Sequence, residues 1–307
     1  MVALSILLAI TGGVLMSIQS PTNTELSKYV GNCQAACMSF GGGLLILLIA
    51  SIIDGGGSIE MLTRAQPWML CGGFYGAALV LVVTFAAPAL GIALTLTLMM
   101  LGQLVMGTIV DWLGLFHTAV ITITPLRIAG CLITTVGIIL VYVGKKQQGG
   151  SKSSQKSAAV LLSIISFGAG CLGSIQTPSN AALADLVGTI ESSCMNFVVG
   201  TVALLIVTLV INKGKLNKIT GVGVKPWMLL GGLYGSCAVF FNIVIVPYIG
   251  VVLITVGTML GQLVGALVID SKGLLRSPKI KLNLWRIIGV IIIGVGVTLV
   301  SIAKMNV

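Results

Sequence analysis

Long apolar runs separated by short polar stretches make up nearly all of this sequence. Each run holds about 17–25 residues, the length that a helix needs to cross the hydrocarbon core of a bilayer. The pattern predicts an all-α integral membrane protein of about ten transmembrane helices. We expect these helices near residues 2–19, 32–53, 68–87, 90–110, 126–144, 158–176, 189–211, 227–246, 249–269 and 285–303.

The ten runs form two sets of five that repeat each other in order. Matched motifs that keep one register along the chain indicate duplication, because membrane composition alone would not hold that register. The offset is 157 residues for the first motif (19 to 176) and 159 for the later ones (103 to 262). The repeated motifs are Gln-x-Pro-x-Asn at 19–23 and 176–180, Pro-Trp-x-x-x-Gly-Gly at 67–73 and 226–232, and Gly-Gln-Leu at 102–104 and 261–263.

Five helices is an odd number, so the second set enters the membrane from the opposite side. The sequence therefore predicts two inverted-topology five-helix repeats, at 1–146 and 158–307. The segment between them, 147–157, is rich in Gly, Ser, Gln and Lys and is expected to be a flexible, basic cytoplasmic linker.

The basic residues are distributed unevenly between the two expected membrane faces. Of the 17 Lys and Arg residues, only Arg64, Arg127 and Lys304 fall on the face that holds the chain termini. Because cytoplasmic loops carry the excess of Lys and Arg, we expect both termini to be extracytoplasmic. This distribution accounts for the net charge of +10, and no basic stripe typical of a nucleic-acid partner is present.

Together these motifs resemble the drug/metabolite transporter superfamily, specifically its YdcZ-like branch of five-helix units. The resemblance covers both halves and includes the aspartate after each Gly-Gln-Leu and the arginine that opens the following helix, Asp111 with Arg127 and Asp270 with Arg286. It implies a fused pair of antiparallel units in a bacterial inner (plasma) membrane. It also implies an exporter, and it leaves the substrate open.

The Gln-x-Pro-x-Asn segments are the first candidates for substrate binding. Proline removes a helix hydrogen bond, so we expect a break there, with Asn23 and Asn180 capping short helices over 24–30 and 181–187. Gln19 and Gln176 would then line a binding segment or gate near each membrane face. The alternative is a plain turn that ends each helix, and the sequence does not decide between them.

Gln103 and Gln262 are the second pair of candidates. An amide within an apolar run must find a partner, so each either bridges two helices or faces a polar pathway. Tyr75, Tyr234 and the unmatched Asn242 are weaker substrate-binding candidates of the same kind. The glycines of the Gly-Gly blocks are most simply explained by close helix packing.

The two Asp–Arg pairs have a structural interpretation. Asp111 with Arg127, and Asp270 with Arg286, share one spacing and bracket the loop between two helices. We expect ion pairs that clamp each hairpin at the membrane interface, where the contribution of an ion pair to stability is modest.

Glu191 is the one candidate for coupling to protons. It lies in the first turn of its helix, and its counterpart in the first repeat is Gln34, so the halves differ there at a titratable position. The simpler interpretation is that its charge favours the helix N-terminus.

Enzymatic chemistry finds no support in the sequence. The single histidine, His117, argues against a His-Glu-x-x-His metalloprotease and a zinc site, and no nucleotide-binding glycine loop is present. We expect no cofactor and no metal. The partners expected are a small-molecule substrate and the lipid bilayer, and the sequence leaves monomer and homodimer open.

The function predicted from the sequence is that of a secondary active transporter, an exporter of small molecules or metabolites that works by alternating access. The alternative is a channel, since antiparallel duplicated units also build pores. The lack of charge rings favours the transporter.

Overall fold

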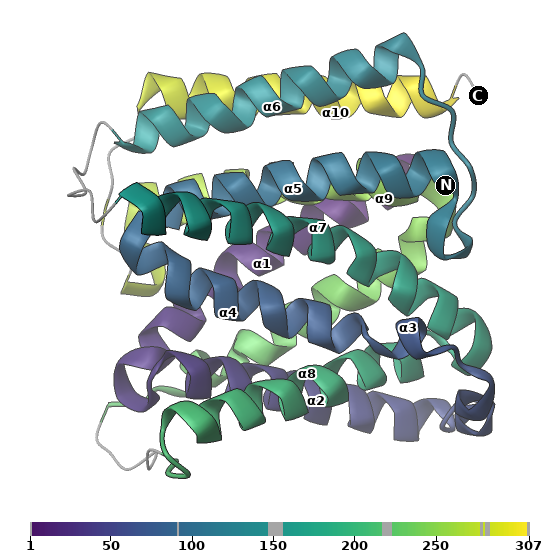
Figure 1. Ribbon diagram of the computed structural model, residues 1–307, viewed down its shortest axis with the longest axis vertical. Helices are drawn as coiled ribbons and strands as arrows, with labels where there is room; N and C mark the ends of the chain where they lie inside the picture. Colours follow the sequence, from purple (N-terminus) through teal and green to yellow (C-terminus); the bar gives the residue numbers. More distant parts are fainter. Residues whose placement is uncertain are drawn as a thin grey trace.

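The protein is a stack of long helices that run roughly parallel or antiparallel to one another (Figure 1). The structure, a computed structural model, describes residues 2–90, 92–146, 156–216, 223–276, 279 and 283–305. Long apolar segments become helices because a bilayer offers no water to their backbone N–H and C=O groups. The helices are α1 (Val2–Val30), α2 (Asn32–Asp54), α3 (Pro67–Leu70), α4 (Gly72–Leu90), α5 (Ile92–Leu113), α6 (Pro125–Lys146), α7 (Lys156–Val187), α8 (Thr189–Ile211), α9 (Gly231–Lys272) and α10 (Leu284–Met305), with 3-10 turns at Ile59–Arg64, Leu115–His117, Pro226–Leu230 and Leu274–Arg276.

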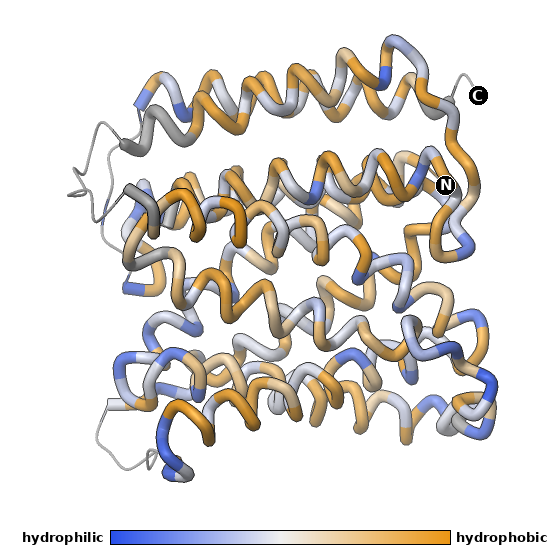
Figure 2. The backbone as a smooth tube through the Cα atoms, viewed as in Figure 1, coloured by the Kyte–Doolittle hydropathy of each residue, from blue (hydrophilic) through white to orange (hydrophobic). Residues whose placement is uncertain are grey.

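In the described residues, seven segments are long and apolar enough to cross a membrane, and the longest of them holds two helices that meet at Gly250 in α9. Gly72–Ala86 and Pro125–Val141 are two shorter apolar helices. Hydrophilic residues gather at the two edges where helices end, with hydrophobic residues between them (Figure 2). The predicted all-α membrane fold is confirmed.

The two repeats interlock across the stack. α6 packs on α10 at one end of the long axis, and α2 packs on α8 at the other (Figure 1). Between them, α1 packs on α9 and α5 packs on α7, so each of these interfaces joins the two repeats. α1 begins at the edge where the N-terminus lies and α7 begins at the opposite edge. Of the linker predicted at 147–157, residues 147–155 lie outside the described residues. α7 begins at Lys156, so the last two residues of the predicted linker belong to that helix.

The predicted break at the Gln-x-Pro-x-Asn segments is wrong. α1 continues through Pro21 to Val30, and α7 continues through Pro178 to Val187. Each helix ends at a glycine with positive φ, Gly31 at 87° and Gly188 at 106°. Proline removes a single N–H, and the surrounding helices hold the rest of the turn in place. The asparagine side chains, free of a capping role, reach neighbouring helices instead.

Small residues bring the crossing helices into close contact. A Cβ added at Gly102 of α5 would overlap the carbonyl oxygen of Phe167 in α7, and one at Gly261 of α9 would overlap that of Ile10 in α1. In the α6–α10 pair, Gly137 faces the backbone of Gly289 in the same way. Without water between helices, such close backbone approach supplies the packing that holds a membrane bundle together.

Both expected Asp–Arg ion pairs form, and the pair in the first repeat is fully buried. Arg286 Nη2 lies 2.7 Å from Asp270 Oδ2, and Arg127 Nη2 contacts Asp111 Oδ2. Asp111 and Arg127 are 0% and 4% exposed, so the expected modest contribution of an exposed pair does not apply to them.

Asp111 also joins the two repeats. At Gly250 (φ 73°, ψ 170°) the backbone of α9 turns, and the next N–H groups lack partners inside the helix. Val251 N–H donates to Asp111 Oδ1 at 2.8 Å, and Val252 N–H donates to Asp111 Oδ2 at 2.9 Å. A carboxylate of the first repeat therefore caps a membrane span of the second.

Candidate functional site

A cavity of about 160 Å³ lies where the two repeats meet. Its walls come from α1, α2, α4, α5, α7, α8 and α9, so both halves contribute to it. Gln103 lies near the middle of α5 and Gln262 near the middle of the second span of α9. Seven side-chain amides line the cavity: Gln19, Gln103, Gln176, Asn180, Asn196, Asn242 and Gln262.

Most of the substrate-binding candidates lie together in this cavity. Its lining contains the four glutamines, Asn180 and the weaker candidate Asn242. Asn23, Tyr75 and Tyr234 are not part of the lining. The lining also contains four polar residues that were not among the candidates expected from the sequence: Thr177, Asn196, Thr255 and Thr258.

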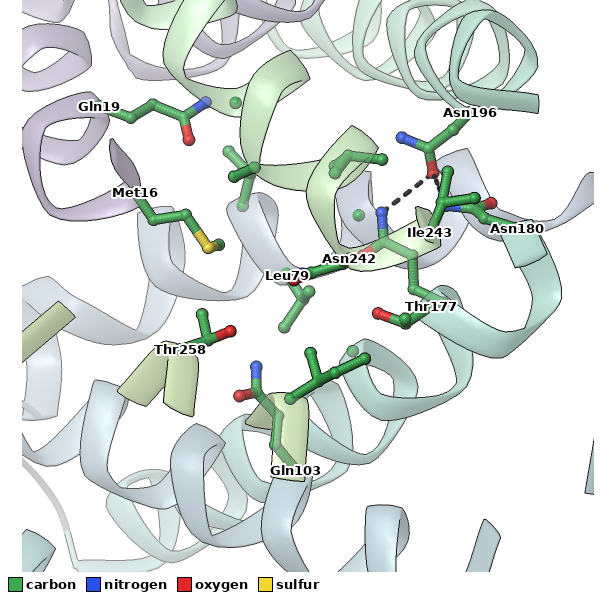
Figure 3. Close-up of a pocket in the computed structure, with 18 of the residues that line it drawn as sticks. Met16, Gln19, Leu79, Gln103, Thr177, Asn180, Asn196, Asn242, Ile243 and Thr258 are labelled. Carbon is green, nitrogen blue, oxygen red and sulfur yellow. Dashed lines mark hydrogen bonds between the residues drawn. The ribbon is translucent and has the colours of Figure 1, made fainter. Parts of the chain in front are cut away.

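Asn196 is the centre of a hydrogen-bonded group on one wall (Figure 3). Gln176 Nε2 and Asn180 Nδ2 each donate to Asn196 Oδ1 at 3.0 Å. Ser192 Oγ donates to the backbone oxygen of Asn180, two residues after Pro178. These contacts fix the amides of α7 and α8 relative to each other.

The opposite wall is less tightly connected. Gln19 Nε2 lies 3.5 Å from Ser39 Oγ, and Gln262 Nε2 lies 3.3 Å from the Met16 sulfur. Both contacts are weaker than the 3.0 Å amide pairs around Asn196. The two related walls therefore differ in how firmly their amides are held.

Each glycine block accommodates the amides of the other repeat. A Cβ at Gly72 would overlap Asn180 Oδ1, and one at Gly231 would overlap Asn23 Oδ1. Four residues further on, a Cβ at Gly76 would lie 2.8 Å from Gln176 Nε2 and one at Gly235 would lie 2.6 Å from Gln19 Nε2. The Gly-Gly-x-x-Gly blocks thus receive the Gln-x-Pro-x-Asn segments, and this reciprocal packing explains both motifs.

The remainder of the lining is apolar. The rings of Phe40 and Phe197, related by the repeat, lie with centroids 5.1 Å apart. Leu79, Ile243 and other aliphatic side chains complete the walls. Among the described residues that line the cavity there is no Asp, Glu, Lys, Arg or His.

Glu191 lies outside the cavity lining. It is 5% exposed, and Ser51 Oγ donates to its Oε1 at 2.9 Å. Its carboxylate also faces Gly57 and Gly188, at the edge where α2 ends and α8 begins. Glu191 therefore lies in a packed contact between the connection after α2 and the connection before α8.

The described part of the chain holds no group of three or more His, Cys, Asp or Glu side chains placed to bind a metal ion.

Comparisons with known proteins agree with the repeats. The family model described as "Putative inner membrane exporter, YdcZ" matches residues 4–140 and again 161–299. A solved structure titled only "Crystal structure of protein" has a TM-score of 0.72 and 16% identity, and covers 99% of this chain and 98% of its own. That likeness concerns the fold alone. A comparison with curated proteins found no match.

Proposed function

Because the chain belongs to the YdcZ family of inner membrane exporters, we propose that it is a secondary active transporter that exports small molecules or metabolites by alternating access. Family membership implies transport across the membrane rather than enzymatic catalysis. The observation that carries the proposal is the cavity between the repeats, lined by amides from both. Transporters built from inverted repeats bind substrate at such a repeat interface near the bilayer midplane.

The packing around the cavity supports movement of the two repeats relative to each other. Reciprocal contacts of glycine with amide and backbone groups connect the halves around the cavity, and small residues permit neighbouring helices to slide. In this mechanism the repeats rock about the substrate site, so that it opens to one face and then to the other. A channel would instead require a continuous path, and no observation favours one.

Gln103 and Gln262 provide the test of transport. Proteoliposomes loaded with a cytosolic small-molecule extract should release a subset of compounds, identified by mass spectrometry. We expect Gln103→Leu and Gln262→Leu to slow that release roughly fivefold, because each removes an amide hydrogen bond that a substrate can use, worth about 1 kcal/mol. Gln66→Leu, an exposed glutamine outside the cavity, is the control.

The same proteoliposomes separate a transporter from a channel. A transporter saturates and shows counterflow of the released compound, whereas a pore does neither. If the glutamine variants lose thermal stability yet transport normally, both amides serve only to bridge helices and the cavity is not the substrate site.

We also propose that the edge holding both termini faces outward. The ends of the chain lie at the same edge (Figure 1), together with the loop between α5 and α6. The excess of basic residues at the opposite edge supports this orientation. A reporter that is active only outside the cytoplasm should be active when fused to the C-terminus. Activity of a cytoplasmic reporter at that position would contradict the orientation.

Proton coupling through Glu191 stays a prediction. Its packed position outside the cavity means that a proton there would act on the contact between the connections after α2 and before α8, not on substrate directly. A proton-driven flux with an unchanged pH profile in Glu191→Gln would end this hypothesis.

A further inference from the structure

We infer that the cavity recognises a small uncharged molecule carrying both a hydrogen-bond donor and an acceptor, and that Asn196, Asn242 and Thr258 of the second repeat select it. The inference rests on the proposed function, since it assigns a ligand class to the same cavity. It adds a chemical preference and an asymmetry that the pseudo-symmetric fold does not require.

The lining determines the charge of the ligand. Its described residues contain no ionisable acid or base. The two Asp–Arg pairs, Asp111–Arg127 and Asp270–Arg286, do not line the cavity, and in each pair one charge is opposed by the other. A net charge moved into such a site loses its hydration without gaining a counter-charge, which is costly in a low-dielectric interior. An uncharged ligand avoids this cost.

Three polar atoms of the lining determine which hydrogen bonds the ligand can form. Asn196 Nδ2, Asn242 Oδ1 and Thr258 Oγ1 are buried and have no hydrogen-bond partner in the protein. Asn196 and Thr258 are only 2% and 8% exposed. Figure 3 shows Asn196, Asn242 and Thr258 among the residues that line the cavity. They offer one donor, one acceptor and one hydroxyl that can do either.

Such orphaned atoms are uncommon in folded proteins because each one costs stability. A ligand with its own donor and acceptor would satisfy them. The apolar walls and the volume of about 160 Å³ suit a ligand with a compact apolar body. For comparison, an apolar cavity of about 150 Å³ accepts benzene.

The asymmetry follows from the repeat. The glutamines occur as matched pairs, Gln19 with Gln176 and Gln103 with Gln262, so both repeats contribute them equally to the cavity. The three orphaned groups have no such match. Their counterparts in the first repeat are Ser39, Val83 and Met99. Recognition by unmatched groups therefore holds the ligand toward the second repeat.

Isosteric probes test the charge preference. Benzamide, benzoate and benzamidinium share one shape and differ in charge, as do acetamide, acetate and acetamidinium. A ligand that binds only the folded protein raises its unfolding temperature with increasing concentration. With purified full-length protein in detergent, we expect benzamide or acetamide to raise the unfolding temperature and their charged analogues to leave it unchanged.

Thr258→Val and Thr201→Val form a matched pair of variants. Thr201 Oγ1 is also buried without a partner, but Thr201 does not line the cavity. Both variants remove an unsatisfied hydroxyl, so both should fold and be at least as heat-stable as the parent. Only Thr258→Val should weaken amide binding, by roughly five- to tenfold for one lost hydrogen bond. Asn242→Leu should act like Thr258→Val and provides a second variant.

The inference is overturned if a charged analogue binds as well as its amide, or if neither amide binds at millimolar concentration. It is also overturned if Thr201→Val weakens binding as much as Thr258→Val does. Because binding is measured without flux, amide binding by a protein that shows no counterflow would refute the proposed transport and leave this inference standing.

Discussion

Replacing Asp111 with alanine is expected to lower the free energy of unfolding by about 3–5 kcal/mol, the cost of leaving a buried charge without its partner. The change leaves Arg127, which is 4% exposed, without a counter-charge and uncaps Val251 and Val252 at the turn in α9. Unfolding in mixed micelles, followed by circular dichroism, measures the effect.

Asp54→Ala is the control for this prediction. Asp54 lies exposed at the end of α2, where removing a carboxylate should change stability by less than about 0.5 kcal/mol. Equal losses in the two variants would show that Asp111 does not hold the two repeats together. If Asp111→Ala is too unstable to purify, the milder Asp111→Asn variant keeps the comparison possible.

Gly102→Ala should destabilise the protein by about 1–3 kcal/mol through overpacking. The added Cβ would approach the carbonyl oxygen of Phe167 within the 3.0 Å below which such contacts are essentially never found. A backbone carbonyl cannot rotate away as a side chain can, so α5 and α7 must separate along their interface.

Gly168→Ala provides a control on the partner helix. A Cβ at Gly168 of α7 meets nothing within 4 Å, and alanine is favoured over glycine inside a helix by about 1 kcal/mol. The two substitutions are chemically identical, yet they should shift the unfolding temperature in opposite directions. Gly102→Ala should lower it, and Gly168→Ala should raise it. Loss of stability in both, or in neither, would contradict the close packing of α5 on α7.

The helices and the paired glutamines of the cavity could be predicted because each occurs twice in the sequence. Long apolar runs fix the helices, and duplication draws attention to Gln19, Gln103, Gln176 and Gln262, which the structure brings together. Asn196 and Thr258 escaped notice because their counterparts are Ser39 and Met99, so a search for matched motifs passes over them. An asparagine within the apolar run at 189–211 was the signal that could have identified Asn196.

The wrong prediction at the prolines and the unforeseen role of Asp111 have a common physical cause. A proline is locally a helix breaker, yet α7 passes through Pro178 because its neighbours hold the turn. An Asp–Arg spacing predicts a hairpin clamp, yet it does not show that Asp111 also caps α9 of the other repeat. Each outcome depends on contacts between residues far apart in the sequence, which local patterns do not contain.

Sided labelling of the cavity tests the central claim most directly. A Thr258→Cys variant, with the seven native cysteines replaced, would be reconstituted in one orientation and exposed to a membrane-impermeant maleimide from either face. Alternating access predicts that Thr258→Cys reacts from each face in turn, without the reagent crossing the membrane. Reaction from neither face would place Thr258 in a static core, and passage of reagent through the protein would make it a pore; either result would contradict the account.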